Sequence, residues 1–367
     1  MTRVSGIWGS GTNGTPATTE NHFSAVASGA YDLGVVTGMP AWRQVQLLIA
    51  QQLGEPLYDA EPLTPVRLSR MTWAARARAT GSIVVKVRES DDGRADEKAR
   101  WCAAHLPALG ARGYPVPAIL WHGMISAQWQ VTVQSRLPGR PLGTLDGPVL
   151  AEALRLVELQ ANAGIADQGR DFTGYVANVL FDDWDEVWAD APRACAAAGP
   201  LCERLRRWLE PVWGLRLPPA DYAHNDLNSS NILTDGTRIT GVVDWDEFGL
   251  GSRALDLVVL AFDCERSGDH AAADRLLARA ARVAGDDGLR CLISYRAIAA
   301  LAHLTVEWRS YGKSLADASC AEVSAILDRL QAASGSGRGL PLRERPASLN
   351  ATNGQPVGGE ADPPGCR

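Results

Sequence analysis

The 367-residue sequence predicts an α+β protein in which a small β-rich lobe precedes a larger, mostly helical lobe. Three observations support this prediction. Short β-rich runs occupy residues 62–135, helical patterns dominate from about residue 146, and only one hairpin, in "NILTDG" and "RITGVVDW", interrupts the helical part. A chain of this length can form one large domain or two modest ones.

The first elements follow from composition and periodicity. Residues 1–38 are rich in Gly, Ser, Thr and Asn without a sustained period, which predicts a flexible arm. Apolar residues at helical spacing predict a helix near 40–53. The smaller lobe is expected over residues 39–136. Its expected strands are "VRLSRM", "AARARA", "SIVVKVR" and "WQVTVQSRL", and "ADEKARWCAAHLPALGARG" predicts a helix that ends at glycine.

The larger lobe is expected over residues 137–332 and begins with the Pro- and Gly-containing connector "LPGRPL". Its helical runs are "GPVLAEALRLVELQANAG", "PLCERLRRWLEPVW", "HAAADRLLARAARVAG" and "LRCLISYRAIAALAHLTVEWRSYG". A turn at Asp235 and Gly236 joins the two strands of the hairpin. The Gly- and Pro-rich residues 333–367 predict a disordered tail.

Charge and cysteine content restrict the class of protein. A net charge of −6 argues against a nucleic-acid partner; it suits a cationic small molecule, although solubility alone explains the same charge. Seven widely spaced cysteines without a C-x-x-C pair predict reduced thiols in a cytoplasmic protein. Neither a secretory signal nor an apolar run long enough for a membrane span is found, and the oligomeric state stays open.

One polar stretch has the residues that phosphoryl transfer requires. In "HNDLNSSNIL" (224–233), Asp226 and Asn231 form the pattern D-x-x-x-x-N, and His224 precedes it. Phosphoryl transfer needs a carboxylate that orients the attacking hydroxyl and accepts its proton, together with oxygen ligands for Mg²⁺. We therefore predict that Asp226 acts on the acceptor and that Asn231 binds the metal.

A second acidic stretch follows the hairpin. Asp244 ends the strand in "GVVDW", thirteen residues after Asn231, so the hairpin should bring these two side chains together as ligands of Mg²⁺. Asp246 and Glu247 come next and could reach a second ion, a water or a basic substrate. Solvated hairpin charges are the favoured interpretation of these two carboxylates.

The cation for the phosphates is expected in the smaller lobe. Lys86 lies in the β-branched strand "SIVVKVR", and Glu97 begins a helix eleven residues later. A strand lysine paired with a helix glutamate is a common device for binding nucleotide phosphates. The alternatives are a lysine that extends to solvent and a first-turn glutamate favoured by the helix dipole.

Together these residues resemble the aminoglycoside phosphotransferase and choline kinase superfamily, over residues 62–330. "GYPVPAIL", "LPGRPL" and the Asp256 of "LDL" support the resemblance. It implies a protein-kinase-like fold with Mg²⁺ and ATP or GTP. The roles implied are the base Asp226, the magnesium ligands Asn231 and Asp244, the phosphate lysine Lys86 with its partner Glu97, the nucleotide-binding residues Ser135 and Leu137, and the loop-bracing residues His224 and Asp256.

The sequence departs from the superfamily at three places. H-N-D replaces H-G-D, and Gly251-Ser252-Arg253 replaces a common Gly-Asp-Pro. Residues 68–81 contain no glycine before Gly81, so the turn that covers the phosphates is expected to consist of Ser69, Arg70, Met71 and Thr72.

The predicted function is transfer of a γ-phosphate to a hydroxyl of an aminoglycoside-like or other hydroxylated, cationic antibiotic. A metabolic kinase for an amino alcohol or sugar is one alternative. A nucleotide-binding pseudokinase without turnover is another, because the glycine loop is missing. The acidic, aromatic stretch "LFDDWDEVWAD" (180–190) is either a cradle for a polyamine-like substrate or an amphipathic helix with a buried aromatic stripe.

Overall fold

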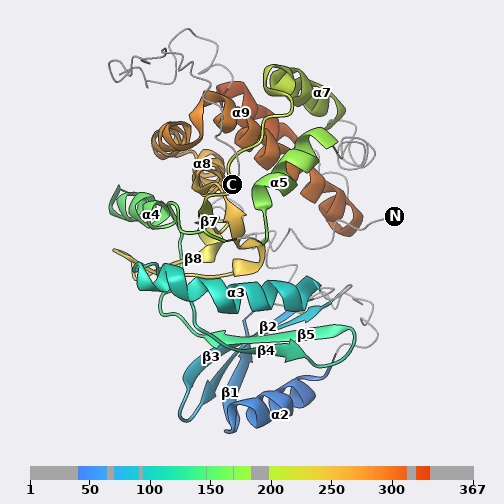
Figure 1. Ribbon diagram of the computed structural model, residues 1–367, viewed down its shortest axis with the longest axis vertical. Helices are drawn as coiled ribbons and strands as arrows, with labels where there is room; N and C mark the ends of the chain where they lie inside the picture. Colours follow the sequence, from blue (N-terminus) through green and yellow to red (C-terminus); the bar gives the residue numbers. More distant parts are fainter. Residues whose placement is uncertain are drawn as a thin grey trace, which may run out of the picture.

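The computed structural model describes residues 40–63, 70–90, 94–145, 147–167, 169–182, 198–311 and 320–330. The expected arm, the expected tail and most of the stretch 180–190 lie outside the described residues. The described part has a five-stranded antiparallel sheet and a larger, mostly helical lobe, which confirms the predicted α+β class (Figure 1).

The smaller lobe is a sheet with the strand order β1-β2-β3-β5-β4. Its strands are β1 (Leu57–Pro62), β2 (Arg70–Ala77), β3 (Gly81–Glu89), β4 (Ile119–Met124) and β5 (Trp129–Ser135). The prediction that Arg70, Met71 and Thr72 belong to the turn covering the phosphates is wrong. These residues are part of β2 and pair with β3. Ser69 lies outside the described residues.

The two faces of the sheet differ because side chains alternate along a strand. Val85 and Val87 of β3 belong to the same buried apolar cluster as Ile49 of α2 (Trp42–Leu53), the helix predicted near 40–53. Lys86 and Arg88 lie at the intervening positions of β3 and therefore point to the opposite face. The polar face of the sheet is thus turned toward the rest of the molecule.

Helix α3 (Arg94–Ala111) lies between the sheet and the larger lobe (Figure 1). Leu106 and Leu109 are almost fully buried, and they belong to the apolar core of the larger lobe instead of the core beneath the sheet. The helix therefore follows the smaller lobe in sequence but packs with the larger one.

The larger lobe holds the remaining elements. Its helices are α4 (Gly147–Leu159), α5 (Phe172–Ala177), η1 (Asn178–Asp182), α7 (Ala198–Leu209), η2 (Glu210–Val212), η3 (Ser229–Asn231), η4 (Trp245–Glu247), α8 (Arg253–Ser267) and α9 (His270–Tyr311). Gly285, with a φ of 74°, separates α9 into the two helical runs expected from the sequence. No helix in the described ranges is long and apolar enough to cross a membrane.

The strands of the larger lobe flank the loop that contains Asp226 in the sequence. They are β6 (Arg140–Pro141), β7 (Asp221–Ala223), β8 (Ile232–Thr234), β9 (Ile239–Val242) and β10 (Gly249–Gly251). The predicted hairpin is confirmed as β8 and β9, with β6 of the connector added beside β8. β7 pairs with β10, which brings the segments before and after the hairpin together.

Candidate active site

The hairpin brings the two expected metal ligands to one end. The main-chain N–H of Val243 donates to the carbonyl of Asn231 at 2.9 Å, one residue before Asp244. Asp244 has a φ of 63°, in the left-handed region that non-glycine residues seldom adopt. Asn231 and Asp244 therefore come together as the sequence predicts.

The backbone of the loop that contains Asp226 is fixed by hydrogen bonds to the carbonyl of that residue. This oxygen accepts from the main-chain N–H of Asn228 at 2.8 Å and from the amide Nδ2 of Asn231 at 2.9 Å. Because the Nδ2 of Asn231 is used in this way, its Oδ1 is the atom that can serve a metal. Asn228, to which the sequence assigned no role, also caps η3 by accepting from the N–H of Ser230 at 3.1 Å.

The environment of the Asp226 carboxyl favours its protonated form. Burial raises the pKa of Asp226 to about 8, the charge of Arg296 opposes this rise, and the charge of Asp244 adds to it. Glu247 contributes a further, smaller increase to this pKa. In its ionised form a carboxylate with a raised pKa binds a proton more strongly, and a pKa near the operating pH suits a general base.

His224 and Asp256 hold the loop from behind. The buried His224 donates from Nε2 to the carbonyl of Val243 at 2.9 Å and accepts at Nδ1 from the N–H of Asp226 at 3.3 Å. Burial lowers the pKa of His224, in keeping with a neutral ring. The fully buried Asp256 accepts from the main-chain N–H groups of His224 at 2.9 Å and Asn225 at 2.7 Å.

Asn225 explains why H-N-D can replace H-G-D. Its φ is 66°, a left-handed conformation that glycine adopts freely and asparagine tolerates better than most residues. Its Nδ2 donates to the carbonyls of Glu247 at 2.9 Å and Ala223 at 3.2 Å. The side chain that distinguishes this chain therefore ties the catalytic loop to the segment after Asp244.

Lys86 reaches the site from the smaller lobe. Its side chain is 11% exposed, and its Nζ lies 2.5 Å from Oδ1 of Asp244 and 3.8 Å from Oδ1 of Asp246. Arg88, on the same face of β3, forms an ion pair with Asp246. The cation that the sequence places in strand β3 thus meets the carboxylates of the hairpin.

The expected ion pair between Lys86 and Glu97 is not formed in the described structure. Glu97 is exposed on α3, whereas the next residue, Lys98, points inward and places its Nζ 2.9 Å from Oε1 of Glu247. Successive residues of an α-helix are rotated by about 100°, so a shift of one position moves a side chain to another face. The helix presents a lysine where the sequence suggested a glutamate.

The interpretation of Asp246 and Glu247 as solvated charges is wrong. The side chain of Asp246 is 13% exposed beside Arg88, and that of Glu247 is 8% exposed beside Lys98. Both partners precede the carboxylates by about 150 residues or more. No local pattern in the sequence could have revealed them.

Ser135 and Leu137 lie where β5 leaves the sheet for the connector. The hydroxyl of Ser135 accepts from the N–H of Ala118 at 2.9 Å. Leu137 packs on Gly241 of β9, where a Cβ would stand 2.8 Å from the Cδ1 of Leu137. Both residues are at the junction of the lobes, and their contact with a nucleotide stays a prediction.

The donor set suits Mg²⁺. Asn231 offers an amide oxygen and Asp244 a carboxylate, which are the hard oxygen ligands that this ion prefers in combination with phosphates and waters. Asn231 is buried with its amide orientation fixed, and Asp244 is partly exposed. These two residues would hold the ion.

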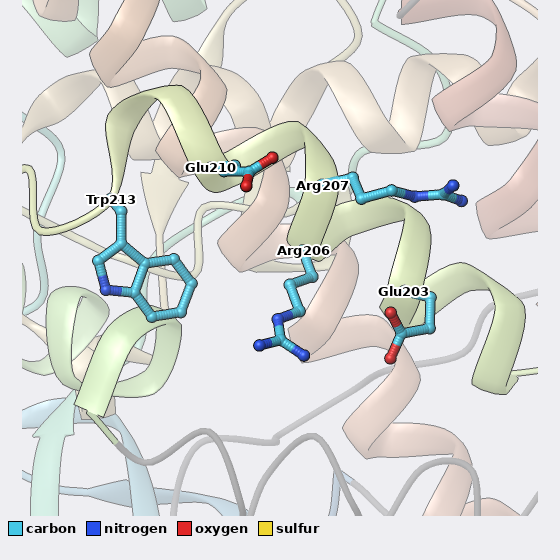
Figure 2. A pocket seen from close by; sticks show the side chains of 5 residues that line it. All are labelled: Glu203, Arg206, Arg207, Glu210 and Trp213. Atoms are coloured by element: carbon cyan, nitrogen blue, oxygen red, sulfur yellow. The ribbon is translucent and has the colours of Figure 1, made fainter.

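A separate pocket lies on α7 and the turn that follows it. It is lined by Glu203, Arg206, Arg207, Glu210 and Trp213. Figure 2 shows Glu203, Arg206 and Trp213 pointing to one side of this helical segment. The ring of Trp213 packs at 5.2 Å from that of Phe181. None of the predicted site residues lines this pocket, so it is not where the reaction is expected.

The chain is similar to known proteins, and the family match covers the part that holds this site. Residues 64–301 match the family model described as the phosphotransferase enzyme family. Over 141 residues the chain is 32% identical to viomycin phosphotransferase of Streptomyces vinaceus, covering 35% of this chain and 48% of the relative. Over 168 residues it is 26% identical to hygromycin-B 4-O-kinase of Escherichia coli, covering 40% and 48%. The chain thus spans about half the length of these curated relatives.

Solved structures share the fold at lower identity. A thermostable mutant of aminoglycoside phosphotransferase APH(4)-Ia, in ternary complex with ADP and hygromycin B, is 19% identical with a TM-score of 0.56 and covers 77% of this chain and 98% of its own. A candidate fructosamine-3-kinase from Thermobifida fusca YX-ER1 is 18% identical with a TM-score of 0.52 and covers 77% and 98%. The family match extends over both lobes and the catalytic loop, so the chain belongs to the phosphotransferase enzyme family and has its protein-kinase-like fold.

Proposed function

We propose that this chain transfers the γ-phosphate of ATP or GTP to a hydroxyl group of a small molecule. The observation that carries the proposal is the meeting of Lys86 with Asp244 at 2.5 Å, across 158 residues of sequence and between the two lobes. This contact supports the proposal, because phosphoryl transfer requires a cation for the phosphates, a carboxylate for the metal and a base close together.

In this proposal each side chain has a separate part. Asp226 orients the acceptor hydroxyl and takes its proton as the oxygen attacks phosphorus, and its raised pKa supports this part. Lys86 supplies positive charge for the phosphates that are not transferred. When bound, Mg²⁺ would neutralise phosphate charge, and Asn231 and Asp244 would hold it.

The leading acceptor class is a hydroxylated, cationic antibiotic of the aminoglycoside type. Two relatives are named as kinases of antibiotics, viomycin and hygromycin B. Burial raises the pKa of Tyr295, and the charges of Tyr175, Glu247 and Asp226 add to this rise. Tyr295 packs against Phe172 and Tyr175 with ring centroids 6.0 and 6.3 Å away. The carboxylates of Glu247 and Asp226, which lie close enough to Tyr295 to affect its pKa, are the charges that would attract a cationic acceptor.

A sugar is the second candidate acceptor. Arg296 lies close enough to Asp226 for its charge to lower the pKa of that carboxyl. A fixed cation near the base repels a polycationic acceptor and tolerates a neutral or anionic one. The fold similarity to a candidate fructosamine-3-kinase is compatible with this class but shows the fold alone.

The Asp226→Asn variant tests the proposal. Release of ADP and GDP would be measured with Mg²⁺ and a panel of hygromycin B, kanamycin, viomycin, choline, ethanolamine and hexoses. We expect one acceptor class to be phosphorylated and the variant to lose about 10²–10⁴-fold in turnover, as expected for loss of a general base. Nucleotide affinity should change little.

Asp235→Asn is the matched control, because Asp235 caps the turn of the same hairpin through the N–H of Thr237 and is exposed. This control should keep its turnover. Wild-type-like turnover in Asp226→Asn would rule out the assigned base. Binding of nucleotide without consumption by any acceptor would identify a pseudokinase.

A further inference from the structure

We propose that Lys98 and Glu247 are positioning residues for the phosphotransfer site, and that their ion pair holds α3 against the loop that carries Asp244. The inference rests on the proposed function, because it assigns the pair to the site of Asp226. The sequence analysis gave no role to Lys98 and favoured a solvated charge for Glu247.

Glu247 lies where the two lobes and the catalytic loop meet. Its Oε1 is 2.9 Å from the Nζ of Lys98, and its Oε2 is 3.8 Å from Nη2 of Arg170. Its side chain is only 8% exposed, so its charge depends on these cations. Removal of one partner of a buried ion pair strongly destabilises the folded state, because it leaves an uncompensated buried charge.

The backbone around Glu247 is held as firmly as its side chain. Its carbonyl accepts from Nδ2 of Asn225 at 2.9 Å, one residue before Asp226. Arg170 donates from Nη1 to the carbonyls of Asp246 at 3.2 Å and Phe248 at 2.9 Å, on either side of Glu247. Movement of Glu247 would therefore displace the catalytic loop and the segment after Asp244 together.

Helix α3 makes a second contact with the same turn. Cys102, one helical turn after Lys98, donates its S–H to the carbonyl of Trp245 at 3.2 Å. Trp245 directly follows Asp244 in the sequence. The two contacts fix the position of α3 against residues 245–247, and α3 also packs against β4 and β5 of the sheet that holds Lys86. The pair thus sets the position of Lys86 relative to Asp244.

The sign of the charge that α3 contributes is the opposite of the one expected from the sequence. A helix glutamate was expected to hold the strand lysine. Instead the helix supplies the cation, Lys98, and the segment after Asp244 supplies the carboxylate, Glu247. Lys86 pairs with Asp244 and Asp246 and needs no helix glutamate in this state.

The test measures how strongly Mg²⁺ tightens nucleotide binding. The dissociation constants of AMP-PNP and GMP-PNP would be determined by calorimetry with and without Mg²⁺, and their ratio compared among variants. Coupling between two bound ligands commonly changes affinity 5- to 150-fold, and we expect Lys98→Met and Glu247→Gln to reduce this ratio by about tenfold. Lys98→Arg should keep it. The double variant with Lys98→Glu and Glu247→Lys, in which the charges are exchanged, should recover part of the ratio.

Arg329→Met is the matched control. It removes an arginine whose Nε lies 2.8 Å from the buried carboxylate of Glu265 on α8. We expect this control to lower the thermal unfolding midpoint and to leave the ratio unchanged. The midpoint would be recorded for every variant, so that a general loss of folding is recognised.

Two results would overturn the inference alone. One is a wild-type ratio in both Lys98→Met and Glu247→Gln while Asp226→Asn is inactive, which leaves the proposed function standing. The other is an equal decrease of this ratio in Arg329→Met, which would show that the pair of Lys98 and Glu247 contributes only to general stability. A wild-type protein whose nucleotide binding ignores Mg²⁺ would overturn the inference and the proposed function together.

Discussion

Two residues of the site have left-handed backbones, and both are held there by neighbours. Asn225 has a φ of 66° and Asp244 a φ of 63°. Conformations of this kind cost free energy and persist where the surrounding structure enforces them. Asp256 binds the N–H of Asn225, and Lys86 binds the side chain of Asp244. The conformation of both residues therefore depends on side chains from other parts of the chain.

Asp256→Asn tests whether the loop depends on Asp256, because it replaces only one carboxylate oxygen by an NH₂ group. Asn keeps one acceptor oxygen and presents an NH₂ group to a site that supplies N–H donors from His224, Asn225 and Gln160. Each buried donor left unpaired costs about 1–3 kcal/mol, so the free energy of unfolding should fall by at least that amount. Urea denaturation measures it.

Asp286→Asn is the control for this substitution, because Asp286 is exposed on α9. Its free energy of unfolding should stay within about 0.5 kcal/mol of the wild type, as for most surface substitutions. Equal stability of Asp256→Asn and Asp286→Asn would contradict a bracing role for Asp256.

Among the elements, the connector is fitted closely to the hairpin. Gly139 has a φ of +108°, and a Cβ there would stand 2.2 Å from Oγ1 of Thr240 and 3.0 Å from the carbonyl of Thr234. The hydroxyl of Thr240 donates to the carbonyl of Pro138 at 2.6 Å. The connection between the lobes therefore requires glycine at this position, for backbone conformation and for space.

Gly139→Ala should destabilise this junction. A non-glycine residue in such a conformation costs about 1–3 kcal/mol, and the clash with Thr240 adds to it. Thermal unfolding should show the loss. Gly143→Ala is the control, because Gly143 is exposed and its Cβ would meet nothing within 4 Å. If both variants unfold at the same temperature, the close fit of the connector is refuted.

For the whole molecule, the decisive feature is that α3 shares the core of the larger lobe. Leu106, Leu109 and Tyr114 are buried in that core, although they lie between strands of the smaller lobe in sequence. The ring of Trp101 also packs against Phe248 at 6.5 Å. Because the lobes share a helix as well as ion pairs, we expect them to unfold together.

Leu109→Ala tests this coupling. Truncation of a fully buried leucine to alanine costs about 2–5 kcal/mol through lost burial and the remaining cavity. The expected result is one urea transition, shifted to lower concentration and identical by tryptophan fluorescence and circular dichroism. Leu47→Ala on α2 is the control, since Leu47 is 65% exposed. Two separated transitions in Leu109→Ala would show that the lobes are independent.

Local features of the sequence determined the helices and strands with a clear apolar periodicity. They also determined which site residues that are close in the sequence come together. The helices near 40–53 and from residue 146, the hairpin and the approach of Asn231 to Asp244 depend on thirteen residues of separation or fewer. Asn225 could also have been anticipated, because H-N-D stands where glycine is usual and asparagine tolerates a positive φ.

Only the tertiary structure decided which charges meet. Periodicity shows that one face of α3 is buried, but Glu97 and Lys98 differ by one position, and the packing of the whole helix selects Lys98 for the inner face. The partners Lys86 and Asp244 lie 158 residues apart, and Lys98 and Glu247 lie 149 apart. An ion pair leaves no local pattern at such separations, because its free energy depends on distance and burial in the folded state.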